Sequence, residues 1–197
     1  MKIEQILSII DLLKPAWAPI CTLLAGYIGV KYGLKQVMIR KKLDFVELQL
    51  REFYSPLLGC HKEIRAKSEL RLKISNAASE AWKEKCEKNS EPSINHEKKF
   101  EPYKKLIEYN NEQLRNDLLP LYHNMLMIFR KNYWLAEPQT RKWYSELCDF
   151  VEIWDRWISE SIPKEVIEKL DHSEERLKPF YQELENQNYI LRNKLSR

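Results

Sequence analysis

The sequence predicts an all-α protein: a single N-terminal transmembrane helix, then a kinked long helix and an antiparallel helical bundle. Three observations carry this prediction. An uncharged run extends from Pro15 to Val30, apolar residues beyond it recur every three or four positions, and all four glycines lie within the first 59 of 197 residues. Glycine supplies the positive φ angles of tight hairpins, so its absence from residues 60–197 argues against β-sheets and glycine-rich nucleotide loops.

Composition narrows the class of protein further. Hydrophobic residues make up 44% of the chain and charged residues 31%, so we expect a packed core rather than disorder. The 33 basic and 29 acidic side chains are largely interleaved, and we therefore expect no nucleic-acid partner. Four scattered cysteines argue against a disulfide framework or a zinc site and fit a reducing compartment.

We expect three parts along the chain. Residues 1–14 carry apolar side chains on one helical face, and this amphipathic segment either lies on a membrane surface or begins the anchor itself. Residues 15–38 form the transmembrane anchor with a basic collar, and residues 39–197 form the cytosolic helical bundle. The stretch at about 89–102 lacks apolar periodicity and contains two prolines, so it is the expected loop of the bundle.

The anchor is predicted from its length and its flanks. A span needs about 20 apolar residues, and Pro15–Leu34 offers twenty positions. The side chains expected to face lipid are Trp17, Ile20, Leu23, Leu24, Tyr27, Ile28 and Val30. The competing interpretation places residues 16–34 in the core of a wholly soluble helical protein.

Flanking charge predicts the orientation of the anchor. The basic residues that follow it are Lys31, Lys35, Arg40, Lys41 and Lys42, against Lys2 and Lys14 before it. This excess favours a single-pass protein of the bacterial inner membrane with its N-terminus outside and its C-terminal domain in the cytoplasm. The same collar is expected to contact lipid headgroups.

Small side chains follow one face of the anchor. Cys21, Ala25, Gly29 and Gly33 recur every four residues, a spacing that lets two membrane helices approach closely. Besides membrane lipids, we therefore expect a second copy of the chain as a partner of this helix.

A heptad-like apolar seam runs from Ile39 to Ile64. It fits either a coiled coil that continues from the membrane or one helix of a bundle. Pro56 and Gly59 interrupt the rod and predict a kink near Ser55, and a kinked helix favours the bundle. Further helices are predicted to begin at Tyr103, Pro138 and Asp171, the first with a kink at Pro120 and the last ending at about Leu195.

No catalytic motif is recognisable, so we expect a protein without enzymatic activity, cofactor or metal. The enzyme alternative is a small helical ribonuclease. Arg115-Asn116 followed by His123 is similar to the Arg-to-His motif of HEPN-type bacterial ribonucleases. The spacing is longer than in that family and Pro120 interrupts it, which argues against this alternative.

An aromatic and basic corner is the expected surface for an unknown protein partner. Tyr133 and Trp134 precede Pro138, and Arg141 and Lys142 follow it. Such a group of side chains can bind a partner. The alternative is that the aromatic side chains only seal the end of the bundle.

Two segments carry a resemblance. Phe53–Leu57 and Asn132–Pro138 resemble segments of uncharacterised bacterial proteins with one predicted N-terminal transmembrane span and a helical cytosolic domain. That family has no established activity, so the resemblance implies only a bacterial origin and a membrane location. The sequence thus predicts a membrane-anchored helical binding or assembly module, which could belong to a multi-component system, for example of a defence type.

Overall fold

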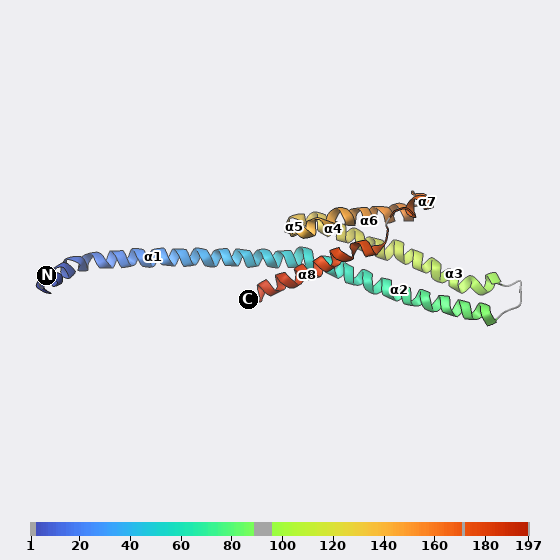
Figure 1. Ribbon diagram of the computed structural model, residues 1–197, viewed down its shortest axis with the longest axis horizontal. Coiled ribbons are helices and arrows are strands. Elements are labelled where there is room, and N and C mark those ends of the chain that lie inside the picture. Colours follow the sequence, from blue (N-terminus) through green and yellow to red (C-terminus); the bar gives the residue numbers. More distant parts are fainter. Residues whose placement is uncertain (1–2, 89–95, 171, 197) are drawn as a thin grey trace. The chain divides into compact units, whose positions relative to one another are not determined.

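The computed structural model describes residues 3–88, 96–170 and 172–196, except for the side chains of residues 3–18, 20 and 96. All regular secondary structure in this described part is helical, which confirms the predicted all-α class (Figure 1). The side chains of the predicted amphipathic segment 1–14 lie outside the description, as do those of Trp17 and Ile20. The chain divides into two compact units, Met1–Val46 and Glu47–Arg197.

The first unit consists of most of helix α1, Ile3–Gln49. Every described side chain from Cys21 to Leu43 is exposed. Taken by itself, this unit gives the side chains from Cys21 to Leu34 no core to pack against. The interpretation that places residues 16–34 in the core of a soluble protein stays a prediction.

No helix in the part of the chain that the structure describes is long and apolar enough to cross a membrane. This finding does not support the predicted span Pro15–Leu34. The physical reason is that Lys31 interrupts the uncharged run after Val30, and Lys35 adds a second charge one turn later. The opening residues of the predicted run, 15–18 and 20, have side chains outside the description.

The second unit is a helical bundle, as predicted. Its elements are η1 Leu50–Tyr54, α2 Ser55–Lys88, α3 His96–Gln113, η2 Leu114–Leu118, α4 Leu119–Lys131, η3 Tyr133–Leu135, α5 Pro138–Arg141, α6 Trp143–Ile158, α7 Lys164–Ile167, η4 Glu174–Leu177 and α8 Lys178–Leu195. Figure 1 shows α2 and α3 running antiparallel as a hairpin, with α8 crossing the first part of α2.

Two boundaries differ from the prediction. Of the loop expected at about 89–102, residues 96–102 are helical instead, because α3 begins at His96 and accommodates Pro102 with the loss of one backbone hydrogen bond. Residues 89–95 lie outside the description. Asp171, the predicted cap of the last helix, lies outside the description. Ser173 caps η4 instead, where its hydroxyl accepts a hydrogen bond of 3.2 Å from the Glu175 N–H.

The bundle core is rich in aromatic side chains from four helical segments. The Phe129 ring of α4 packs edge-to-face against Phe53 of η1, with ring centroids 5.1 Å apart, and contacts Tyr144 of α6 at 5.2 Å. Phe180 of α8 stacks on Phe129 at 6.0 Å. Phe53, Phe129 and Phe180 are fully buried, and each aromatic ring of this kind removes roughly 150–250 Å² from water.

Both predicted interruptions appear as short π-helical turns placed directly before a proline. The Ser55 N–H bonds to Leu50 O before Pro56, and the Leu119 N–H bonds to Leu114 O before Pro120. A proline has no N–H to continue the α-helical ladder, so one widened turn takes up the defect. The helix remains continuous through each site.

Candidate functional site

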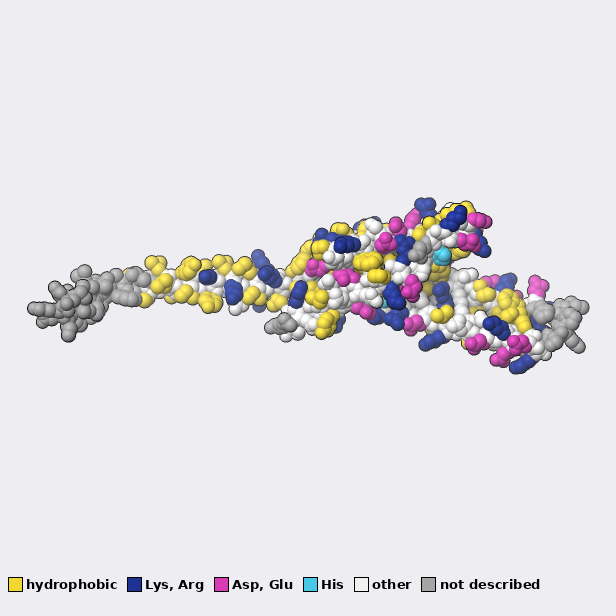
Figure 2. Space-filling view, in the orientation of Figure 1, with side chains coloured by type: hydrophobic (Ala, Val, Ile, Leu, Met, Phe, Trp, Pro, Cys, Tyr) yellow, Lys and Arg dark blue, Asp and Glu magenta, His cyan; other side chains and the backbone are white. Residues whose placement is uncertain are grey.

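The largest apolar surface of the first unit lies along α1 between Cys21 and Leu43. Leu23 is 74% exposed and Tyr27 is 66% exposed. Other large apolar side chains exposed on this segment are Leu24, Ile28, Val30, Tyr32, Leu34, Val37, Met38, Ile39 and Leu43. In Figure 2, hydrophobic side chains follow this helix with a few basic ones between them. An apolar surface of this extent is typical of a segment that another molecule or a lipid phase covers.

The small residues predicted to mediate self-association lie on this segment and are exposed. They are Cys21, Ala25, Gly29 and Gly33. A Cβ added at Gly29 or Gly33 would meet no atom within 4 Å. Packing within this chain therefore does not require glycine at either position.

The basic collar is exposed as well: Lys31, Lys35, Arg40, Lys41 and Lys42. Lys31 Nζ lies 6.0 Å from the ring centroid of Tyr27. Together with Ile28, Tyr32 and Lys35, these two side chains line a shallow depression on the helix. Tyrosine rings beside lysine ammonium groups suit the boundary between apolar and aqueous phases.

The predicted partner surface forms one corner of the bundle. The Arg141 guanidinium lies 5.3 Å from the ring centroid of Tyr133. Its Nε donates to Ala136 O at 2.8 Å, and its Nη2 donates to Trp134 O at 3.2 Å. Lys142 Nζ donates to Gln139 Oε1 at 2.6 Å. Arg141 thus braces the corner, while the ring of Trp134 is 57% exposed on it.

A buried polar network fixes this corner to η1. Gln49 Nε2 donates to Leu135 O at 2.8 Å, and the Glu137 N–H donates to Tyr54 Oη at 2.9 Å. Tyr54 Oη lies 3.1 Å from Thr140 Oγ1, and burial raises the pKa of this phenol. The segments Phe53–Leu57 and Asn132–Pro138 are therefore packed together, although nearly eighty residues separate them in sequence.

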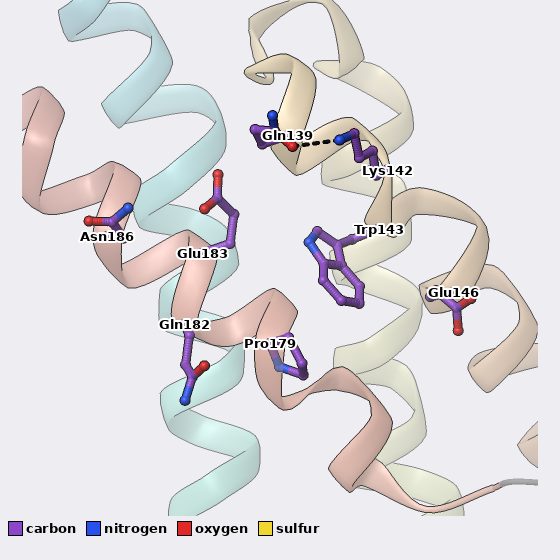
Figure 3. Close-up of a pocket in the computed structure, with 8 residues that line it drawn as sticks. All are labelled: Gln139, Lys142, Trp143, Glu146, Pro179, Gln182, Glu183 and Asn186. Atoms are coloured by element: carbon purple, nitrogen blue, oxygen red, sulfur yellow. Dashed lines mark hydrogen bonds between the residues drawn. The ribbon is translucent and has the colours of Figure 1, made fainter.

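A groove of about 760 Å³ lies beside the corner, between α6 and α8 (Figure 3). The Trp143 indole and Pro179 form its apolar part. The polar side chains around it are Gln139, Lys142, Glu146, Gln182, Glu183 and Asn186. Only Lys142 of this set was predicted as a functional residue, because amide side chains on an exposed helix face give no distinctive sequence signal.

A second hollow, of about 520 Å³, contains a buried histidine whose pKa is strongly lowered. His61 is only 7% exposed, and its ring stacks on Tyr181 with centroids 3.7 Å apart. Its Nδ1 is buried and has no hydrogen-bond partner among the residues that the structure describes. Burial, assisted by the charge of Lys62, lowers the His61 pKa to about 4. Burial also raises the pKa of Tyr181, which donates to Glu174 at 3.3 Å.

The structure does not bring Arg115 and His123 into one pocket. Arg115 Nη2 donates to Ile158 O at 3.2 Å and lines a hollow with Trp157 and Ile158. His123 Nε2 lies 3.0 Å from Asp155 Oδ1 and does not line that hollow. Among the described residues, no cluster of three His, Cys, Asp or Glu side chains is suited to a metal ion.

The fold and these surfaces define a class: an all-α protein that combines a helical bundle with an exposed apolar helix. Comparison of the chain with models of known protein families, with curated proteins and with solved structures finds no match.

Proposed function

We propose that this chain is a non-enzymatic helical binding module that attaches to the bacterial inner membrane through α1. Its bundle faces the cytosol and binds a protein partner at the corner formed by Tyr133, Trp134, Arg141 and Lys142. One observation carries the proposal: large apolar side chains are exposed along α1 from Leu23 onward, and a basic collar follows.

Transfer energies favour lipid as the cover of this segment. Burying one Val, Leu, Ile or Phe side chain completely stabilises by roughly 1.5–3 kcal/mol. Each Lys or Arg near an anionic leaflet adds about 1 kcal/mol. The collar Lys31–Lys42 stands next to the apolar residues, so both terms act in one attachment. In the sequence the stretch Pro15–Leu34 offers twenty positions, which is the length that we propose for a single span, with Lys31 near its end.

The membrane proposal is tested by fractionating bacteria that express the full chain. We expect the protein in the membrane pellet after an alkaline carbonate wash. Ile28→Glu with Leu24→Glu should move it to the supernatant, because two carboxylates would have to enter the apolar phase. The matched control is Met127→Glu with Tyr189→Glu, which changes exposed apolar side chains of the bundle. A wild-type chain that the wash releases would overturn the proposal.

Self-association through α1 is part of the proposal. Gly29→Leu with Gly33→Leu should weaken a dimer in detergent, because the added side chains separate the helices along the small-residue face. Equal association of this variant and the wild type would remove this element and leave the membrane attachment standing.

The ribonuclease alternative needs the Arg115 guanidinium and the His123 imidazole at one phosphodiester. Their separate partners, Ile158 O and Asp155 Oδ1, favour the non-enzymatic proposal. Incubation of the purified chain with RNA tests this choice. Cleavage that disappears in His123→Ala would revive the enzyme alternative.

A further inference from the structure

Helix α2 packs against η1, α3, α4 and α8, and it carries an apolar stripe that is exposed. Leu70, Ile74, Ala77 and Ala81 are all exposed, with Leu70 at 58% and Ile74 at 43%. Their spacing of four, three and four residues places them in one line along the helix. We call these four residues the α2 stripe.

The packing around α2 lies on other faces of the helix. Trp82 points to α3, where its ring lies 5.1 Å from both Phe100 and Tyr103. His61 points to α8, where it stacks on Tyr181. Among the described residues of the bundle, no helix covers the α2 stripe.

The side-chain sizes along the stripe are complementary to those of a second, antiparallel copy of the same stripe. Its first half holds the large side chains Leu70 and Ile74, and its second half holds Ala77 and Ala81. When two copies of α2 lie antiparallel about an axis between Ser75 and Asn76, Leu70 faces the other copy's Ala81. Ile74 then faces the other copy's Ala77. Each large side chain fills the space over an alanine, as close packing requires.

The charged residues beyond each end of the stripe are also complementary in an antiparallel pair. Glu63 and Lys67 continue its line toward the N-terminus, and Glu84 and Lys88 continue it toward the C-terminus. The antiparallel axis sets Glu63 opposite Lys88 and Lys67 opposite Glu84. Within one copy these residues form the pairs Lys67 Nζ–Glu63 Oε1 at 3.1 Å and Lys88 Nζ–Glu84 Oε2 at 3.5 Å. A parallel pair would instead set like charges against one another.

One flank of the stripe adds a third complementary pair. Lys73 and Glu80 are both exposed on the same side of the stripe. In the part of the chain that the structure describes, neither side chain makes an ion pair. An antiparallel coiled pair brings these flanking positions together, so Lys73 of one copy meets Glu80 of the other, twice per dimer.

We propose that two copies of this chain associate through the α2 stripe, with their α2 helices antiparallel. The size pattern, the end charges and the flanking charges each fit a second copy of the chain in the antiparallel orientation. The inference concerns a face of the second unit and does not depend on the proposed membrane attachment.

The test exploits the Lys73–Glu80 pairs. Lys73→Glu gives a chain with two acids on the flank, and Glu80→Lys gives one with two bases, so each variant repels its own copy. We expect the dimer dissociation constant of each variant alone to rise at least about tenfold. An equimolar mixture should recover a heterodimer, because both pairs become attractive. Sedimentation equilibrium of the full chain in one detergent measures all three samples.

The controls separate this face from other contacts. Leu72→Glu alters an equally exposed side chain on another face of α2 and should leave the dissociation constant unchanged. Every sample is also measured with Gly29→Leu and Gly33→Leu, so that association through α1 cannot mask the result. A monomeric wild type in that background, single variants that dimerise normally, a mixture without recovery, or an effect of Leu72→Glu equal to that of Lys73→Glu would each overturn the proposal.

Discussion

The side-chain amide of Asn132 donates a hydrogen bond of 2.7 Å to the backbone carbonyl of Glu52. In an α-helix that carbonyl would accept from residue 56, which is Pro56 and has no N–H. Asn132, in the corner after α4, therefore supplies a side-chain donor to a carbonyl that Pro56 cannot serve. This single bond joins a local defect of the long helix to a loop eighty residues away.

Replacing Asn132 with Ala should destabilise the bundle by roughly 1–2 kcal/mol, because the Glu52 carbonyl loses its donor. Urea unfolding of the second unit, followed by circular dichroism, measures the change. In a Pro56→Ala background the cost should be smaller, since residue 56 then carries an N–H beside the same carbonyl. Equal costs in both backgrounds would show that Asn132 does not compensate for the proline.

Tyr54→Phe should destabilise the bundle by roughly 1–2 kcal/mol. The hydroxyl accepts from the Glu137 N–H at 2.9 Å and bonds to Thr140 Oγ1 at 3.1 Å. Its removal takes this acceptor from the Glu137 N–H and leaves Thr140 Oγ1 with its bond to Glu183 Oε1 at 3.3 Å. Tyr189→Phe, at a residue that is 68% exposed, is the matched control and should change stability by less than about 0.5 kcal/mol. Urea midpoints of the two variants decide between these outcomes.

The sequence predicted those features of the fold that depend on local rules. Apolar spacing predicted the helices, and Pro56 and Pro120 predicted the interruptions that appear as π turns. The prediction of a loop at about 89–102 is wrong for residues 96–102, because Pro102 lies inside α3, where the rest of the helix tolerates one lost hydrogen bond.

Long-range contacts were beyond sequence reasoning. The bond from Asn132 to the Glu52 carbonyl and the stacking of His61 on Tyr181 each join residues that no periodicity relates. For the candidate site, apolarity and charge located the segment Cys21–Leu43, and the described residues contain no helix able to cross a membrane.

The basic collar should make membrane binding sensitive to salt. Changing Arg40, Lys41 and Lys42 to Gln removes three positive charges. The affinity for vesicles with about 30% anionic lipid should therefore fall tenfold or more. The same triple variant should bind neutral vesicles like the wild type. Added salt should reduce wild-type binding toward that of the variant, since screening removes the same attraction. Vesicle flotation of the full chain measures each case, and salt-independent binding would contradict the electrostatic role of the collar.

Acid should destabilise the bundle through His61. Its pKa is about 4 in the folded chain against 6.5 for a free histidine, because burial and the charge of Lys62 disfavour the imidazolium. Between these values the unfolded chain binds more protons, so the free energy of unfolding falls as the pH drops from about 6.5 toward 4. Each unit of pKa difference corresponds to about 1.4 kcal/mol, so we expect the loss to approach roughly 3 kcal/mol by pH 4.

His61→Phe keeps the ring that stacks on Tyr181 and removes the titrating group. It also removes Nδ1, a buried polar atom without a hydrogen-bond partner among the described residues, so the variant should be at least as stable as the wild type at pH 7. Urea unfolding at pH 7, 6, 5 and 4.5 compares the two chains. Because carboxylates elsewhere titrate in both, the difference between the two curves isolates His61. That difference should grow as the pH falls, and parallel curves would mean that the buried imidazole does not control the acid stability of the bundle.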